Sequence, residues 1–335
     1  MQIGFMRAAP HKIAASLGAI IAVLLLAGPA ASQSKSSYPD GPVRVIIPYP
    51  AGGMLDTLAR FLGNAVTSEL GQPLVIENRP GAGGRVGATV VSQAAPDGQT
   101  LLFTTIGTMT ILPLIPPQPP YDVEHDFEPI AALTQQPLLV AVRPSLNVTS
   151  FAQFVELAKK EPGKLSYGSP GIGTEPHLAT ERLLRTIGLD LLHVPYRGGG
   201  PEIIDFMADR IDLVVLPEIT MRPAIGAGKA KILATLSSDR FDKFPEVPSI
   251  KEVGYPGVAY TMTTALFAPA KTPTAVLDRW RNFLPTLQRD PRFIKALQDT
   301  GSTLAVENSS ELTKAMTSDH EEWSQIIRSL NLKLE

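Results

Sequence analysis

The stretch VRVIIPYPAGGMLDTLARFLGNAVTSELG, residues 43–71, decides the fold class of this chain. It starts with VRVII, whose β-branched residues favour a strand. PYPAGG, residues 48–53, interrupts that strand, and apolar side chains then recur at helical spacing from Leu58 to Leu70. Gly71 follows in the position where helices commonly end. The stretch therefore predicts a strand, a glycine-bearing turn and a helix.

The same order of elements occurs twice along the chain. In the first half, strands are expected at 74–77 and 101–105, with a helix over 85–95 between them. In the second half we expect helices over 150–160, 175–187 and 202–208 and strands over 165–167, 192–195, 213–216 and 232–235. Five prolines between residues 112 and 121 predict a connecting loop. Strands that alternate with helices imply mainly parallel sheets covered on both faces.

Two further extended segments, near 130–142 and 259–268, lie between these sets of elements. If both cross between two lobes, the closing helices over 274–288 and 310–331 return to the first lobe. About 300 residues also exceed what a single core usually supports. We therefore predict an α/β protein with a double-crossover hinge, in which each lobe is a mainly parallel sheet flanked by helices. Lobe 1 comprises residues 38–135 and 265–335, and lobe 2 comprises residues 136–264.

The amino-terminal segment has the three parts of a secretion signal. Arg7 and Lys12 are followed by an uncharged run over residues 13–27 and by the small-residue patch Ala30-Ala31-Ser32. The alternative is a membrane anchor, but an apolar run of about 15 residues is short against the roughly 20 that span a bilayer. We predict a signal peptide of residues 1–32 that is cleaved after export to the periplasm.

Composition excludes several classes of function. Without residues 1–32 the chain keeps 28 of its 30 Lys and Arg and all 32 Asp and Glu, a formal charge of −4, so no nucleic-acid partner is expected. Cysteine is absent, which excludes disulfides, thiolate metal sites and cysteine nucleophiles. The remaining histidines lack metal-ligand spacing, and His177 and His193 are interpreted as scattered structural residues.

Two motifs that suggest a cofactor or catalysis do not have the required spacing. GAGGRVG, residues 81–87, misses the third glycine of a dinucleotide-binding turn. GSPG, residues 168–171, is not the GxSxG elbow of a hydrolase. We expect no cofactor, no metal and no enzymatic activity.

Two turns are candidates for ligand binding. Residues 49–56 lie between the carboxyl end of a strand and the amino end of a helix, where open α/β sheets bind ligands and helix amides attract anions. Residues 169–174 repeat this arrangement in the second lobe, and residues 104–110 form either a hydroxyl-lined wall or a polar loop. The alternative is that the glycines only shape tight turns and that Asp56, Ser169 and Thr174 only cap helices.

Several stretches, taken together and in this order, resemble the Bug family, the extracytoplasmic receptors of tripartite tricarboxylate transporters. They are YPDGPVRVIIPYPAGGMLDTLAR from Tyr38, LGQPLVIENRPGAGG from Leu70, APDGQTLL from Ala95, PGKLSYGSPGIGTEPHLATE from Pro162, HVPYRGGGPEIIDFMADRIDLV from His193 and ALFAPAKTP from Ala265. The resemblance covers nearly all of the chain after the signal segment. It implies a type II-like, two-lobed periplasmic binding protein whose cleft closes on its ligand.

The resemblance also implies the kind of ligand and the residues that hold it. Family ligands are small carboxylates, namely di- and tricarboxylates, amino acids and aromatic acids. Backbone amides of the first turn and ordered waters typically hold the carboxylate, opposite a wall formed by the second turn. The expected ligand-binding residues are Tyr49, Ala51, Gly52, Gly53, Asp56, Thr105, Thr108, Ser169, Gly171, Gly173, Thr174, His177, Tyr196 and Glu218.

This chain departs from the family pattern at two places. Thr263-Thr264-Ala265 stands where many members carry a Trp-x-Gly sequence, which changes the hinge or the edge of the pocket. Glu218 follows Leu216-Pro217 where an aspartate is common, and it either contacts an amine of the ligand or faces solvent.

The function predicted from these observations is capture of a small carboxylate by cleft closure. The receptor would present the acid to the membrane permease subunits of a tripartite transporter. The alternative is that the closed protein docks on a periplasmic sensor kinase and reports the acid. A monomer is expected.

Overall fold

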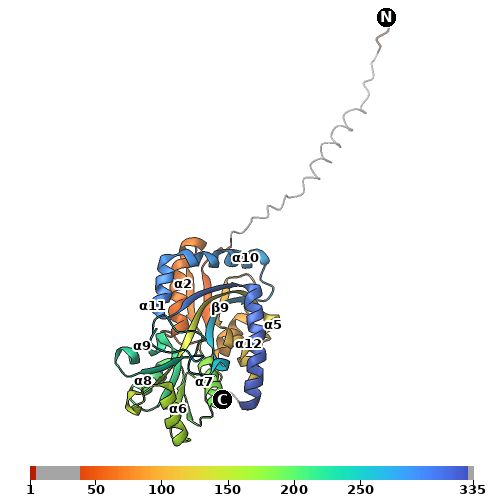
Figure 1. The fold of residues 1–335 in the computed structure, drawn as a ribbon. Helices are drawn as coiled ribbons and strands as arrows, with labels where there is room; N and C mark the ends of the chain where they lie inside the picture. The colour runs from red at the N-terminus through yellow and green to blue at the C-terminus, as the bar shows by residue number, and fades with distance from the viewer. Residues whose placement is uncertain (5–37, 331–335) are drawn as a thin grey trace. The chain divides into compact units, whose positions relative to one another are not determined.

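The computed structural model describes residues 1–4 and 38–330, and residues 38–330 form a two-lobed body (Figure 1). The predicted signal peptide, residues 1–32, lies almost entirely outside the described residues. Among the helices of the described part, none has both the length and the apolar character that crossing a membrane requires.

The sheet of lobe 1 is organised around β1 (Val43–Ile47). β2 (Leu74–Asn78) and β3 (Thr100–Thr105) pair with it in parallel on either side. The connecting helices are α2 (Met54–Leu70) and α3 (Arg85–Ser92). Four of the five residues of β1 are buried because helices cover both faces of this sheet. The motif of residues 43–71 therefore forms the predicted strand, turn and helix.

Two long antiparallel strands, β4 (Phe127–Val142) and β9 (Thr261–Pro269), run side by side. The first part of β4 pairs with β9 and with β10 (Thr303–Asn308), and its last five residues pair with two strands of lobe 2. β4 is thus part of both sheets, which is the predicted double crossover. The boundaries at 135/136 and 264/265 that we assign to the lobes stay a prediction.

The sheet of lobe 2 repeats the arrangement of lobe 1. β5 (Ser166–Ser169) lies between β6 (Leu192–Pro195) and β7 (Leu213–Pro217), and both pairs are parallel. β8 (Lys231–Thr235) pairs with β4. The predicted parallel arrangement holds for the triplets β2-β1-β3 and β6-β5-β7. The crossover strands pair antiparallel to them, so the sheet of each lobe is mixed.

Helices complete both lobes. The helices of lobe 2 are α6 (Phe151–Lys160), α7 (Glu175–Ile187), α8 (Gly199–Met207) and α9 (Glu218–Gly226). After β9 the chain returns to lobe 1 as α10 (Thr274–Phe283), α11 (Pro291–Thr300) and α12 (Ser309–Leu330). α11 packs beside α2, although about 220 residues separate them in sequence (Figure 1). Short helical turns are α4 (Ile106–Thr110), α5 (Val123–Asp126), η1 (Ala82–Gly84), η2 (Leu112–Leu114), η3 (Pro144–Leu146), η4 (Pro256–Val258) and η5 (Leu284–Arg289).

Apart from the short helical turns, three elements are absent from the sequence-based prediction. α9 contains Pro223 in its interior, which conceals the helix from a rule that treats proline as a breaker. α11 and β10 occupy a stretch in which no element was predicted, although Asp290 caps α11 and Gly301 ends it with a φ of 72°. The predicted helix over 274–288 ends earlier, at Phe283, and continues as the 3-10 helix η5.

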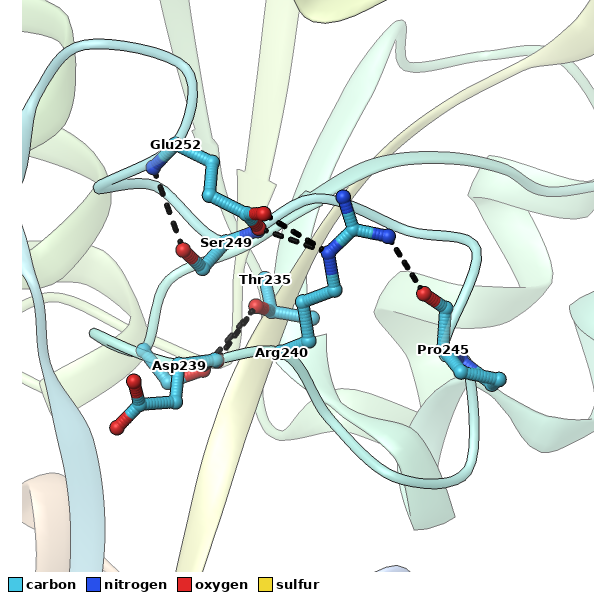
Figure 2. Close-up of polar contacts among 7 residues, drawn as sticks. Thr235, Asp239, Arg240, Pro245, Ser249 and Glu252 are labelled. Carbon is cyan, nitrogen blue, oxygen red and sulfur yellow. Dashed lines mark hydrogen bonds and ion pairs between the residues drawn. The ribbon is translucent and has the colours of Figure 1, made fainter.

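Arg240 stabilises the connection between β8 and β9 in lobe 2 through an ion pair and hydrogen bonds (Figure 2). Its guanidinium donates to both carboxylate oxygens of Glu252, at 3.0 and 2.9 Å, and to the carbonyl of Pro245 at 2.7 Å. Glu252 in turn accepts from the N–H of Ser249 at 2.8 Å. These contacts give a long segment without regular structure a defined path alongside the sheet of lobe 2.

Glu202 of α8 is a fully buried carboxyl group without a partner. Its side chain is 0% exposed, and neither carboxyl oxygen has a hydrogen bond within the described residues. It packs against Gly168 of β5, where an added Cβ atom would lie 2.9 Å from Glu202 Cγ. Burial raises the pKa of Glu202 well above its ordinary value.

Replacing Glu202 by Met should stabilise the protein. The folded carboxyl keeps its proton to higher pH than the unfolded one, whose pKa is near 4.5, so the free energy of unfolding falls as pH rises above that value. At pH 7.5 we expect E202M to unfold with about 1–3 kcal/mol more free energy than wild type, with a smaller gain at pH 5. Urea unfolding at both pH values measures this. The exposed Glu156 on α6 supplies the control E156M, which should change stability by less than about 0.5 kcal/mol. A less stable E202M at pH 7.5 would contradict the prediction.

Candidate ligand-binding cleft

A cavity of about 440 Å³ lies at the carboxyl ends of the parallel strands of both lobes. Its walls come from the segments that follow β1, β3, β5, β6 and β7, and Met262 of β9 contributes from the crossover. Open α/β sheets bind ligands at this edge, because the loops and helix starts meet there. The cleft is therefore built by both lobes and by the hinge that joins them.

Four helices of nine or more residues direct their amino ends at this cavity. They contribute residues 53–55 of α2, 174–176 of α7, 198–201 of α8 and residues 217, 219 and 220 of α9. In each helix the N-cap residue makes no side-chain hydrogen bond to the first turn. First-turn N–H groups lack intrahelical partners and carry partial positive charge. Four such ends around one cavity form a site for an anion.

Asp56 stabilises the turn of lobe 1 through hydrogen bonds on the side away from the cavity. Its carboxylate accepts from the N–H of Gly52 at 2.9 Å and twice from the guanidinium of Arg60 at 3.0 Å. Burial opposes ionisation, but these donors hold the pKa of Asp56 below its ordinary value. Asp56 itself does not line the cavity. The lining residues of this turn include Tyr49, Ala51, Gly52 and Gly53.

Hydroxyl groups join this turn to the end of β3. Tyr49 OH donates to the carbonyl of Gly83 at 3.0 Å and shares a bond of 3.2 Å with Thr108 Oγ1, and burial raises the pKa of Tyr49 to about 12. Thr104 Oγ1 donates to the same Thr108 oxygen at 2.7 Å. Thr105 lines the cavity, whereas Thr108 is buried and is not among the lining residues. The polar-loop alternative for residues 104–110 is wrong, because all five residues of α4 are buried.

A stack of rings supports the turn of lobe 2. The centroid of the His193 ring lies 4.7 Å from that of Tyr167 and 4.3 Å from that of His177. Ser169 Oγ shares a 2.7 Å hydrogen bond with Nε2 of His193, and the N–H of Gly173 donates to Nδ1 of His177 at 3.2 Å. The interpretation of these histidines as scattered was wrong. Parallel pairing of β5 with β6 places His193 opposite Tyr167, a contact that spacing along the chain does not reveal.

The predicted residues of this second turn divide into lining and supporting groups. Thr174 lines the cavity, and its Oγ1 donates to the carbonyl of Gly171 at 2.8 Å. Ser169 and His177 are buried and, like Gly171 and Gly173, are not among the lining residues. Burial lowers the pKa of His177 to about 3, so its neutral ring can accept the Gly173 N–H. These residues hold the turn in place.

Glu175, the first residue of α7, carries a carboxyl group into the cavity wall. It accepts from Tyr260 OH at 2.6 Å and from the hydroxyl of Thr105 and the backbone N–H of Gly107, both in lobe 1. Burial raises the pKa of Glu175 to about 7. Sequence analysis did not identify this residue, which lies between two residues that it did consider, Thr174 and His177.

Arg197 is a second lining residue that sequence analysis did not identify. Its side chain is exposed, and it has no hydrogen bond or ion pair with any residue in the described part of the chain. Arg210, by contrast, is paired with Asp205 at 2.7 Å on the same lobe. The signal was present in the segment PYRGGGP, where an arginine precedes the glycines of a helix start.

Two predicted residues face away from the cavity. Tyr196 OH donates to Asp205 at 3.0 Å. Glu218 is 4% exposed and forms ion pairs with Arg222 at 2.6 Å and Lys243 at 2.9 Å, so the solvent-facing alternative for Glu218 is wrong. Its cationic partners belong to the protein, and it is not among the lining residues.

A wider groove of about 730 Å³ on lobe 2 has a different character. It lies between α6, β8 and residues 244–255, and apolar side chains dominate its walls. One helix amino end reaches it, that of α6, and Ser150 caps this end by accepting from the N–H of Gln153. The helix ends in the cleft between the lobes are uncapped, so the cleft is the better anion site. Within the described residues, no group of three or more His, Asp or Glu side chains is placed to hold a metal ion.

Removing the Asp56 carboxylate should destabilise the first turn. D56A leaves the Gly52 N–H without its acceptor, and we expect the free energy of unfolding at pH 7 to fall by about 1–3 kcal/mol. Since the pKa of Asp56 is lowered in the folded protein, its contribution is present above the ordinary pKa of 3.8 and is lost as pH falls through the folded value. The difference between wild type and D56A should therefore shrink as pH falls below 3.8. D56N keeps an acceptor oxygen and should lose less free energy of unfolding than D56A. Urea unfolding of the three proteins tests this, and equal stability of D56A and wild type at pH 7 would refute it.

Comparison with known protein families and structures gives a consistent result. The family model described as "Tripartite tricarboxylate transporter family receptor" matches residues 58–332. BugT of Bordetella pertussis is 30% identical over 329 residues, which cover 97% of this chain and 99% of BugT.

Two solved structures are similar over most of their length. A Rhodopseudomonas palustris protein solved with adipate has a TM-score of 0.84 at 26% identity and covers 88% of this chain and 99% of its own. MatC of Rhodopseudomonas palustris, solved with bound malate, has a TM-score of 0.79 at 28% identity and covers 87% of this chain and 100% of its own.

Proposed function

This chain belongs to the tripartite tricarboxylate transporter receptor family and is therefore a solute-binding receptor and not an enzyme. We propose that it captures a small dicarboxylate or tricarboxylate outside the inner membrane. The captured acid is handed to the membrane permease subunits of a tripartite transporter. In this proposal residues 1–32 direct export to the periplasm and are then cleaved.

The observation that carries the proposal is the convergence of four uncapped helix amino ends on one cavity. Each end supplies N–H donors and partial positive charge, and a carboxylate accepts hydrogen bonds from these donors and is attracted by the charge. The turn of lobe 1, with Ala51 and Gly53, and the start of α8, with Gly198 and Gly199, are both open to close approach because glycine or alanine lines them.

The charge and size of the cavity favour an acid with more than one carboxylate. Arg197, which has no hydrogen bond or ion pair with any of the described residues, adds a cation next to the amino end of α8. A cavity of about 440 Å³ leaves space for a four- to six-carbon acid together with ordered water, and water-mediated contacts cost little affinity. The adipate and malate carried by the two relatives are acids of this class.

Capture requires the lobes to move about the β4 and β9 crossovers. A ligand that contacts both the first turn of lobe 1 and α8 of lobe 2 makes its full set of bonds only when the cleft is closed, so binding selects the closed state. The permease then recognises the closed form.

A panel of small acids should reveal the ligand by thermal stabilisation. A ligand that binds only the folded protein raises its stability by RT ln(1 + [L]/Kd), which is about 2.7 kcal/mol at 100 times Kd. The panel includes malate, adipate, citrate, glutamate, nicotinate and, as a cation control, putrescine. We expect a rise in Tm with one or more di- or tricarboxylates and none with putrescine. If no acid of the panel raised the Tm, the proposal would be refuted.

Arg197 should contribute to affinity without contributing to stability. Since hydrogen bonds to charged groups are worth roughly 1.5–3 kcal/mol, we expect R197M to weaken binding of the best acid by about 10- to 100-fold. The matched control is R210M, which removes an exposed arginine of the same lobe that does not line the cavity. Isothermal titration calorimetry measures both. Equal losses in R197M and R210M would mean that general electrostatic attraction, and not contact with the acid, explains the effect.

A further inference from the structure

Glu175 forms a contact between the lobes inside the proposed anion site. It is the first residue of α7 in lobe 2, and its carboxyl group lies against α4 of lobe 1. The contact is close, since a Cβ atom at Gly107 would lie 2.2 Å from Glu175 Cγ and 2.5 Å from its Cδ. The donors around the carboxyl are the Gly107 N–H, the Thr105 hydroxyl and Tyr260 OH. Three donors from lobe 1 and the crossover thus surround an acid from lobe 2.

This contact exists only while the lobes are together. Tyr260 immediately precedes β9, and Thr105 and Gly107 belong to lobe 1, so opening at the crossovers withdraws α7 from α4. Glu175 is then returned to water, where a glutamate is ionised at neutral pH. In this structure, where Glu175 of lobe 2 contacts lobe 1, its exposure is 4%. The cost of burying its charge is therefore incurred at closure, the step that captures the ligand.

Further charged groups surround this position on every element packed against it. On α12, Asp319 and Glu322 add negative charge near Tyr260 and Glu175, and burial raises the pKa of Asp319 to about 6. On α7, Arg182 pairs with Glu322.

Three further titratable side chains lie near Glu175 or the cavity: His320, Tyr49 and Arg197. His320 shares a 3.0 Å bond with the carbonyl of Thr110, and Tyr49 faces Glu175 from the turn of lobe 1. Arg197 is the cation that lines the cavity itself. Asp319 is the charged group that acts directly on Glu175, and its charge raises the pKa of Glu175, so a second negative charge in the cavity adds repulsion.

We propose that Glu175 takes up one proton from solvent when the cleft closes on its acid, so that the receptor binds the carboxylate and a proton together. This inference rests on the proposed function, because the captured ligand must be an anion. In the closed complex the neutral carboxyl no longer repels the ligand, and its O–H can donate to an acceptor in the cavity. Glu175 thereby makes affinity depend on pH within the range that a periplasm experiences.

The direction of the dependence follows from the two states. The pKa of Glu175 is about 7 in the closed protein and close to the ordinary 4.5 when exposed, so the closed state binds more protons between these values. Binding is therefore tighter at low pH. With a closed-state pKa of about 7, affinity should be about 10-fold greater at pH 6 than at pH 8.

Calorimetry in several buffers tests the proposal. Malate, adipate or, if neither binds, the best acid of the panel is titrated at pH 6.5 into the full mature protein in phosphate, PIPES and imidazole buffers. The slope of the observed enthalpy against the buffer ionisation enthalpy gives the number of protons taken up, and we expect about 0.5–1 per acid for wild type. In E175Q we expect the number of protons taken up per bound acid to fall to near zero, and an affinity that changes less than about 2-fold between pH 6 and pH 8.

Two further variants exclude other sources of the proton. D319N removes the neighbouring acid of α12 and should keep the wild-type uptake. E175A provides a second test if E175Q does not fold. Uptake that persists in E175Q or E175A, or disappears in D319N, would overturn the assignment to Glu175. Binding of the acid to wild type without proton uptake would overturn this inference and leave the proposed function intact, whereas failure of every acid to bind would remove both.

Discussion

The antiparallel pairing of β4 with β9 is the constraint on which the rest of the structure depends. The two strands pair along residues 127–137 of β4, and the remaining five residues of β4 pair with β7 and β8. At their centre the hydroxyls of Thr134 and Thr264 share a 2.7 Å hydrogen bond. One strand thereby belongs to both sheets. The parallel triplets of the two lobes therefore meet with the carboxyl ends of their strands around one cavity.

That geometry has an electrostatic consequence. A helix follows β1, β5, β6 and β7, and each of these helices begins at the cavity, so partial positive charge accumulates there without any cluster of basic side chains. Arg197 adds one full charge. Glu175 is buried and Asp319 is half-buried, and burial raises the pKa of both. Proteins retain such unfavourable burials mainly where function needs them.

Much of the candidate site was predictable because each half of it is encoded locally. The turn at 49–56 and the turn at 169–174 are both strand-to-helix connections with glycines, and Tyr49, Gly52, Gly53, Thr105 and Thr174 line the cavity as the sequence suggested. Some residues that we predicted as ligand contacts support these turns and do not line the cavity. Asp56, Ser169 and His177 lie in or next to the turns in sequence, but their side chains make hydrogen bonds that support the turns, and they do not line the cavity.

The features that sequence reasoning interpreted incorrectly or missed depend on contacts between distant segments. Glu218 is neutralised by Lys243, 25 residues away, and the ring stack of His193 on His177 follows from the register of β5 with β6. α9 was missed because Pro223 lies inside it. In each case the local pattern is ambiguous, and packing against another element resolves it.

The sequence by itself determined the two α/β units, the crossovers and the two glycine-bearing turns, because strand and helix periodicity and glycine positions act over a few residues. Only the tertiary structure decided which polar groups face the cavity. Whether Arg197 is free, whether Glu175 is buried and whether Glu218 is paired depend on what lies opposite each side chain. The groups that lie opposite these side chains are determined by the pairing of β4 with β9, which brings the two lobes together.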